Sequence, residues 1–569
     1  MAAGVGLTPG IARAADPVAP AAPATQGVAA TGIGPDAVRG LDGRTFSSPA
    51  DRTVVAPRSA DRTGDAARAQ GTQGTQGTQG TQGSSYLAIA LDATAPSAHS
   101  IDLRSIVTTL DDAAFDISIS WGDGTTDKVT GGATADNLHS DLRHTTHTYA
   151  AVGSYDVKVT AKDTTHDVEA VNELRFVTSG AEFTSHTPTR LLDTRAGIGA
   201  AQAKVAGRSS VALKVGGSAQ VPVGVSAVVL NVTVTDTTAA GHISVQPAKD
   251  LAEGAETSNL NFVAGQSVSN LVVAAVGEDG YVHLFNGGWE SVDLLADVTG
   301  YFTPSPASGY TTLTPVRAVD TREGLGTAKG QIAGQASFGV DIAGRRGVPT
   351  GVTAVAINLT VTNPQEAGHL TVYPSGQTAP ATSSVNFAAG GTVANSVIVP
   401  VGPDGRITVR NGSWAPADVV VDVVGYYSPD SRSALVSARV PLRIMDSRTD
   451  SWGRKAGPLP ARSYLALRLE GDTTSPDVDG WVLNTTVTNT TGAGFLSVAP
   501  DPNFWSAYQN GTAVTPERPV ASTLNWTAGA SVPNVAQTPG GKGGIVDLWN
   551  QGWENIDLVV DLLGFYQTN

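Results

Sequence analysis

The chain has 569 residues, of which 15 % are charged, with 65 Gly, 32 Pro, no Cys and a formal net charge of −15 at pH 7. The acidic balance disfavours nucleic acid as a partner, since no basic run offsets repulsion from the phosphates; the lack of cysteine excludes disulfide bridges, thiolate metal sites and a cysteine nucleophile. Thr, Val, Ser and Asn crowd the ordered part, a composition typical of strands and turns.

The first part of the chain, residues 1–83, has no pattern of a folded domain. Ala12-Arg13-Ala14 fits a signal-peptidase site, so residues 1–14 are interpreted as the remnant of an export signal that starts upstream. Residues 15–83 are rich in Ala and Pro and close on a Gly-Thr-Gln repeat, which predicts a disordered linker, with a glycosylated stalk as the alternative. No run approaches the ~20 apolar residues of a membrane span. We therefore expect a secreted, extracellular protein, released or held non-covalently at the cell wall.

Residues 84–180 alternate apolar and polar side chains in short runs. A Trp-Gly-Asp-Gly turn stands at 121–124, and His-Thr-Tyr at 147–149 precedes an alternating strand at 154–160. Such runs, separated by turn residues, predict antiparallel strands. Together these motifs resemble a PKD domain. The resemblance implies an immunoglobulin-like (Ig-like) β-sandwich, which occurs as an accessory module on secreted bacterial proteins.

The rest of the chain consists of three copies of one sequence repeat. A Pro-x-Arg-x-x-Asp-Thr/Ser-Arg element begins at Pro188 and returns at Pro315 and Pro441, a spacing well above the ~20–50 residues of a solenoid repeat. We place the copies at residues 181–304, 308–429 and 433–569. They resemble a repeat of many secreted and cell-wall-associated actinobacterial proteins, a resemblance that implies a location more than a chemistry.

Each copy contains many short strands. In the first copy, Val228 and Leu230 share one face of a strand while Asn231 and Thr233 share the other. The last strand of each copy is apolar, and we expect these strands at 293–302, 418–427 and 557–566. This pattern favours a sandwich over a barrel. The expected fold is therefore all-β: an Ig-like β-sandwich and three tandem β-sandwich domains, with a disordered N-terminal tail.

A carboxylate lies inside the last strand of each copy, at Asp297, Asp422 and Asp561. A buried carboxylate is costly unless it is paired. We expect a structural ion pair in each copy that joins the first and last strands, namely Arg195–Asp297, Arg322–Asp422 and Arg448–Asp561. A calcium site or a catalytic carboxylate pair is the alternative interpretation of the same acids. No other metal or cofactor is expected.

A tryptophan follows a turn just before the last strand of each copy, at Trp289, Trp414 and Trp553. An exposed indole can stack on the C–H face of a sugar ring, so these three residues are candidate carbohydrate-binding residues. The alternative is a lid over the end of the sandwich core. No Gly-x-Ser-x-Gly elbow or His-Glu-x-x-His motif occurs, and the third copy contains no histidine.

The linker, the PKD-like domain and the three copies leave no segment large enough for a separate catalytic domain. We therefore expect no catalytic residues and no enzyme activity. The sequence favours a secreted, multivalent binding or adhesion protein whose partner is extracellular or cell-wall polysaccharide, or a surface protein. A structural spacer or self-assembling coat protein is the first alternative, and an unrecognised cell-wall or glycan hydrolase is the second.

Overall fold

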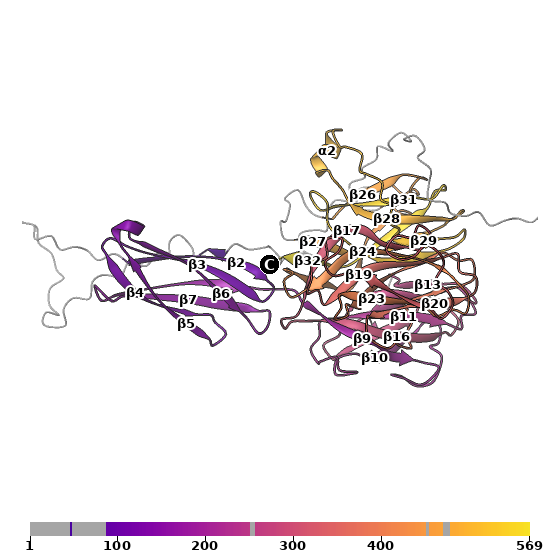
Figure 1. The fold of residues 1–569 in the computed structure, drawn as a ribbon, viewed down its shortest axis with the longest axis horizontal. Helices are drawn as coiled ribbons and strands as arrows, with labels where there is room; N and C mark the ends of the chain where they lie inside the picture. The colour runs from indigo at the N-terminus through magenta and orange to yellow at the C-terminus, as the bar shows by residue number, and fades with distance from the viewer. Residues whose placement is uncertain (1–45, 48–86, 251–256, 451–453, 470–477, 569) are drawn as a thin grey trace, which may run out of the picture.

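The computed structural model describes residues 46–47, 87–250, 257–450, 454–469 and 478–568 (Figure 1). They form strands joined by turns, which confirms the expected all-β class. The expected export-signal remnant at 1–14 lies outside the described residues. So does the expected linker, apart from β1 (Phe46–Ser47), which pairs with the edge of β2 (Leu87–Ser97). No helix in the described ranges is long and apolar enough to cross a membrane.

The PKD-like part is a β-sandwich of two antiparallel sheets, ordered β1-β2-β3-β6 and β5-β4-β7-β8. Its further elements are β3 (Ser100–Thr109), β4 (Ala113–Ser120), β5 (Thr126–Ala133), the 3-10 helix η2 (Ala135–Asn137), β6 (Ser140–Thr148), β7 (Ser154–Asp163) and β8 (Val168–Val177). Burial alternates along the strands, so one face of each sheet packs into a core that contains Phe115, Trp121 and Tyr149. In Figure 1 this sandwich projects from one side of the body formed by the repeats.

The first repeat contains eight strands in two four-stranded sheets, ordered β14-β11-β16-β9 and β10-β15-β12-β13. These strands are β9 (Glu182–Asp193), β10 (Ser209–Lys214), β11 (Ala227–Thr235), β12 (Gly241–Gln246), β13 (Leu260–Phe262), β14 (Val268–Ala275), β15 (Tyr281–Asn286) and β16 (Asp293–Thr303). Eight strands in this order form a double-sheet jelly roll. The first and last strands, β9 and β16, are neighbours in one sheet.

The other two repeats have the same strand order. The second contains β17 (Gly309–Asp320), β18 (Ser337–Asp341), β19 (Ala354–Thr362), β20 (Gly368–Pro374), β21 (Val385–Phe387), β22 (Val393–Pro400), β23 (Arg406–Asn411) and β24 (Asp418–Ser428). The third contains β25 (Ser433–Asp446), β26 (Tyr464–Arg468), β27 (Val478–Thr488), β28 (Gly494–Pro500), β29 (Leu524–Trp526), β30 (Val532–Thr538), β31 (Ile545–Asn550) and β32 (Asp557–Thr568). It also carries a short helix, α2 (Trp505–Gln509), between β28 and β29.

The sheet that holds the first and last strands of each repeat is buried on both faces. On β11, Val228 and Leu230 belong to the core of the first repeat. Ala227 and Val229, on the opposite face, join a second apolar cluster that draws side chains from all three repeats. Alternate residues of this strand therefore face two different buried environments, the core of the repeat and the cluster shared by all three repeats. The other sheet of the first and second repeats is half-exposed and lies on the outside of the body, whereas β26 and β31 of the third repeat are almost wholly buried.

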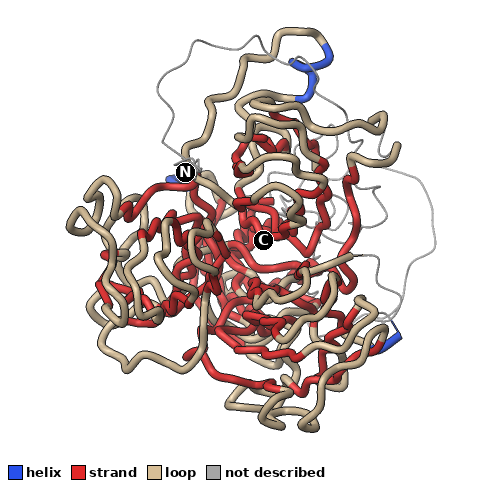
Figure 2. The backbone as a smooth tube through the Cα atoms, turned by 90° about the vertical axis from the view of Figure 1, so that its right-hand side faces the viewer, coloured by secondary structure: helices blue, strands red, loops and turns tan. Residues whose placement is uncertain are grey.

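Side-chain amides on the shared face join the repeats into a closed ring. In each repeat, an asparagine of the middle strand donates a hydrogen bond to a serine carbonyl of the next repeat; the pairs are Asn231–Ser383, Asn358–Ser522 and Asn484–Ser258. Because each repeat makes the same contact with the next, a pseudo-threefold axis relates the three. Figure 2 shows the corresponding lobes of strands around a common centre.

Aromatic side chains fill the centre of the ring at one end. Tyr427 and Tyr566, near the C-terminal ends of β24 and β32, join their hydroxyls in a 2.6 Å hydrogen bond. The side-chain oxygen of Gln537 lies 3.2 and 2.9 Å from the same two hydroxyls. Just beyond β16, the carbonyl of Pro304 accepts a 3.1 Å hydrogen bond from the amide of Val152. This end of the ring therefore adjoins the PKD-like sandwich.

Candidate binding surface

The carboxylate of the last strand is paired, but its partner is not the arginine that we expected. Asp297 accepts a bidentate pair of bonds from Arg190, at 2.6 and 3.0 Å. Arg195 instead makes a bidentate contact with Asp193, at 2.9 and 2.8 Å. The expected Arg195–Asp297 pair is therefore wrong. A β-bulge beside Asp297 shifts the register and places Arg190 opposite it.

The same correction applies to all three repeats. The structure pairs Arg317 with Asp422 and Arg443 with Asp561. The two arginines expected in that role, Arg322 and Arg448, bind the aspartates of their own motif, Asp320 and Asp446. The expected function of the contact is preserved, because each pair still ties the first strand of a repeat to its last strand.

The paired carboxylates have no surface available to a substrate. The side chains of Asp297, Asp422 and Asp561 are 1, 0 and 2 % exposed. Burial raises the pKa of Asp297, and the neighbouring Arg190 opposes that rise. Asp293, at the start of the same strand as Asp297, accepts a 2.7 Å hydrogen bond from Thr194. Within the described ranges, no three Asp, Glu, His or Cys side chains gather in a way that could hold a metal ion.

The three tryptophans that precede the last strands are the largest exposed apolar side chains in their turns. Trp289 is 81 % exposed, Trp414 is 83 % exposed and Trp553 is 68 % exposed. The alternative interpretation as lids over the sandwich cores is therefore wrong, because a lid would be largely buried. Apolar rings of this size are usually removed from water unless they have a partner.

A buried asparagine holds each tryptophan turn in place. The side-chain amide of Asn286 donates to the carbonyls of Val205, Ala206 and Glu290 at 3.1, 3.2 and 2.8 Å, while its oxygen accepts from Gly288 at 3.0 Å. Asn411 and Asn550 make the equivalent bonds in the other repeats. The turns are thus fixed before any ligand arrives. The asparagine recurs before all three tryptophans, and this recurrence is the signal in the sequence that marks the turn.

The residue beside each tryptophan differs among the repeats. The guanidinium carbon of Arg208 lies 5.6 Å from the Trp289 ring centre, and that of Arg462 lies 4.8 Å from the Trp553 ring centre. Gln335 has the corresponding place near Trp414 and donates to the carbonyl of Ser413 at 2.9 Å. A cation over an indole face is attractive. Sequence patterns do not reveal these arginines, because they come from a loop distant in the chain.

The three tryptophan turns lie at one end of the ring. Each turn stands just before β16, β24 or β32, whereas the other ends of these strands meet in the aromatic cluster next to the PKD-like sandwich. Because the pseudo-threefold axis relates the three repeats, their tryptophan turns lie at the same level along that axis. All three turns therefore lie at the end of the ring that faces away from the PKD-like sandwich. In Figure 1 the labels β13, β20 and β29, on strands that pair near these turns, also lie on the far side.

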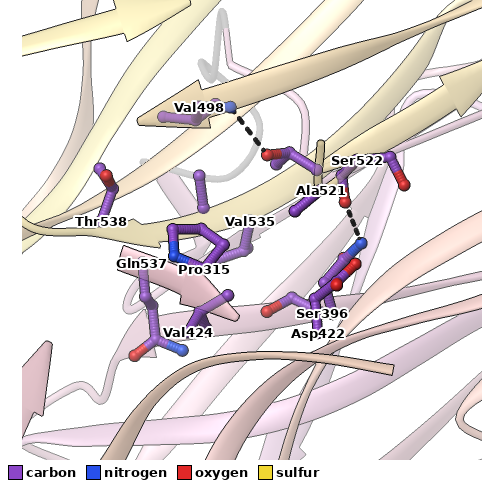
Figure 3. A pocket seen from close by; sticks show the side chains of 13 residues that line it. Pro315, Ser396, Asp422, Val424, Val498, Ala521, Ser522, Val535, Gln537 and Thr538 are labelled. Atoms are coloured by element: carbon purple, nitrogen blue, oxygen red, sulfur yellow. Dashed lines mark hydrogen bonds between the residues drawn. The ribbon is translucent and has the colours of Figure 1, made fainter. Parts of the chain in front are cut away.

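Two narrow pockets lie at the seams between repeats, and neither contains a tryptophan. One is lined by Asn358, Asp422 and Gln537 at the seam between the second and third repeats (Figure 3). The other is lined by Asn231 and Asp297 at the seam between the first and second. Asn358 and Asn231 already form the ring bonds, and Asp422 and Asp297 already form the ion pairs. The exposed tryptophan turns are therefore the stronger candidate for a binding site.

Comparison with known proteins identifies one domain. The PKD-domain family matches residues 91–175, whereas the repeats match no family. No curated protein matches the chain. A solved structure of Sulfolobus Turreted Icosahedral Virus is similar at 8 % identity and a TM-score of 0.14, over 69 % of this chain and 93 % of that chain. Another, of a triple jelly roll fold and turret assembly in an archaeal virus, is similar at 9 % identity and 0.14, over 68 % and 90 %. At these values neither likeness carries an argument.

Proposed function

We propose that this is a secreted, non-catalytic binding protein, and that its ring of repeats holds extracellular or cell-envelope polysaccharide through Trp289, Trp414 and Trp553. The observation that supports the proposal is the exposure of three indoles, at 81, 83 and 68 %, at one end of the body. A polysaccharide offers many equivalent sugar faces. It can therefore occupy several turns at once.

The chemistry of each turn suits a sugar ring. An indole presents a flat apolar face that matches the C–H face of a pyranose, and its N–H remains available for a hydrogen bond. The hydrogen bonds from the side-chain amides of Asn286 and its counterparts fix the turn, so little conformational freedom is lost on binding. A single contact of this kind is weak.

The ring turns three weak contacts into one stronger attachment. Linked sites can gain ~10²–10⁴ in apparent affinity when their geometry permits simultaneous binding. Here the spacing between sites is set by packed jelly rolls and by the Asn–Ser bonds, not by flexible linkers. The PKD domain adjoins the opposite end of the ring, so it leaves the tryptophan end open.

A retention assay on insoluble polysaccharides tests the proposal. The intact protein is incubated with cell wall, chitin and cellulose, next to a variant with all three tryptophans changed to Ala. Leu142→Ala, which removes an exposed leucine of the PKD domain that is 53 % exposed, is the matched control. We expect retention of the wild type and of the control, and loss of the triple variant. Absence of retention on every polymer would overturn the proposal, and ordered arrays in electron micrographs would then favour a coat protein.

A further inference from the structure

We propose that the tryptophan turn of the third repeat binds an acidic sugar, with Arg462 and Arg518 holding its carboxylate while Trp553 stacks on the ring. This inference rests on the proposed function of the turns and adds the charge of the ligand. It concerns one turn of the three, because the side chains around Trp553 differ from those around Trp414.

Two arginines and two indoles are assembled at this turn. Arg462 lies over Trp553, with 4.8 Å between its guanidinium carbon and the ring centre. Arg518 lies over Trp549 in the same way, at 5.5 Å. Trp549 is in turn stacked on Tyr464, with ring centres 4.6 Å apart. Trp549 is only 4 % exposed and packs beneath Arg518, so Trp553, at 68 %, is the exposed indole of this turn, with the two guanidinium groups beside it.

Neither guanidinium is neutralised by the protein. Arg462 donates to the carbonyl of Gln551 at 2.6 Å, and Arg518 donates to the carbonyl of Arg462 at 3.0 Å. Among the residues that the structure describes, no carboxylate lies within ion-pair distance of either one; Glu517, which precedes Arg518, and Glu554, which follows Trp553, are both exposed. Burial and the charge of Arg518 both lower the pKa of Arg462. Two like charges held together in this way gain when an anion binds between them.

A carboxylate suits this pair better than a neutral sugar does. A guanidinium presents N–H groups in a planar fork that matches the two oxygens of a carboxylate. A hexuronic acid carries such a group on a pyranose ring, so one residue can meet both the arginines and the indole. The net charge of −15 disfavours polyanions at long range, so recognition has to come from this local contact.

The second repeat shows which side chain the fold accepts in place of Arg462; there Arg410 donates a 2.7 Å hydrogen bond to Gln335. Arg462 has a positive φ of 56°, and Gln335, at the corresponding place in the second repeat, has a φ of 60°. Glutamine therefore occupies this backbone position in a folded jelly roll. The Arg462→Gln change removes the charge and keeps a side chain that the fold already accepts. The first repeat has only Arg208 beside its tryptophan, so we expect a weaker preference for acid there.

The test compares polygalacturonate with its fully methyl-esterified form, which has the same sugar without the charge. Binding is measured near 0.15 M salt for the wild type, Arg462→Gln, Arg518→Gln and the exposed control Arg432→Gln. We expect each of the first two variants to lose at least tenfold in affinity for polygalacturonate, with the control unchanged and the methyl ester bound weakly by all. Dextran sulfate serves as a polyanion without carboxylates and should be bound more weakly than polygalacturonate.

Three results would overturn the inference: equal affinity for the acid and its ester, no effect of either variant, or equal binding to dextran sulfate. If neutral polysaccharide is retained through the tryptophans, the proposed function survives while this inference fails. If no polysaccharide of either kind is retained, both fail. Melting temperatures of all variants, recorded beside the affinities, separate loss of binding from loss of folding.

Discussion

The side-chain amide of Asn484 in the third repeat donates a 2.6 Å hydrogen bond to the carbonyl of Ser258 in the first repeat. This bond joins the third jelly roll back to the first and closes the ring. Three domains that follow one another in sequence are thereby held as one body. The arrangement also fixes the relative positions of the tryptophan turns, on which the proposed function depends.

Breaking this bond should destabilise the ring as a unit. Asn484→Ala leaves the Ser258 carbonyl without its donor in a partly buried seam, which costs about 1–3 kcal/mol. In calorimetry we expect one transition for all three repeats, shifted to lower temperature. Thr235→Val, which removes an exposed hydroxyl contact with Ser267 inside the first repeat, should have little effect. A separate, unshifted transition for the other repeats would show that they unfold independently.

The corrected ion pair gives a contrast between two arginines in one motif. Arg190→Gln leaves the buried carboxylate of Asp297 without its bidentate partner, a loss that typically costs ~3–5 kcal/mol. Arg195, whose side chain is 46 % exposed, pairs with Asp193, which also contacts Arg190 at 3.2 Å. Arg195→Gln should therefore cost about 1 kcal/mol or less. Urea unfolding of both variants measures the difference, and equal losses would contradict the pairing.

An acid of the third repeat should make stability depend on pH. Asp547 is fully buried, and burial together with the nearby Asp501 raises its pKa from 3.8 to about 10. Between these values the folded state holds a proton that the unfolded chain has lost, so stability falls as pH rises. The slope for one such group is at most about 1.4 kcal/mol per pH unit.

The variant Asp547→Asn, which is neutral at every pH, should remove this part of the slope. We expect it to be more stable than the wild type at pH 8 and to differ less at pH 5, as measured by urea unfolding. Asp430→Asn, at an exposed position, is the control and should follow the wild type at both pH values. Parallel pH profiles for Asp547→Asn and the wild type would contradict the buried, protonated state.

The turn asparagine should matter for binding more than its distance from the ligand suggests. Asn286→Ala removes the bonds that tie the Trp289 turn to the carbonyls of Val205 and Glu290. The indole is then present but less well held, so the cost of ordering it is added to binding. We expect polysaccharide affinity to fall several-fold. The Trp289 side chain should also become more mobile, which lowers its fluorescence anisotropy. Unchanged affinity would show that the hydrogen bonds of Asn286 do not contribute to binding.

Much of the fold follows from sequence patterns. The apolar runs expected at 293–302, 418–427 and 557–566 are strands that begin at those same residues, because alternation and turn residues mark them clearly. The PKD domain was marked by its paired turn motifs. The sequence locates the three tryptophans but does not predict their exposure, because a buried lid and an exposed ring have the same sequence pattern.

The remaining features depend on contacts that a linear pattern does not contain. Asn231 stands on a polar face, and a polar face toward solvent has the same sequence signature as one toward another repeat. The arginine partner of Asp297 was misassigned because counting by alternate residues cannot register a bulge. Arg518 comes from the segment between β28 and β29 that also carries α2, and only the folded chain brings it beside Arg462.

The most direct measurement is the affinity of the intact protein for one retained polysaccharide as the three tryptophans are changed to Ala one, two and three at a time. If the turns act together, the variants that keep a single tryptophan lose the ~10²–10⁴ in apparent affinity expected for linked sites, and the triple variant loses binding altogether. Melting temperatures should stay constant across the series, because Trp289, Trp414 and Trp553 are exposed. A triple variant that binds as tightly as the wild type would contradict the account.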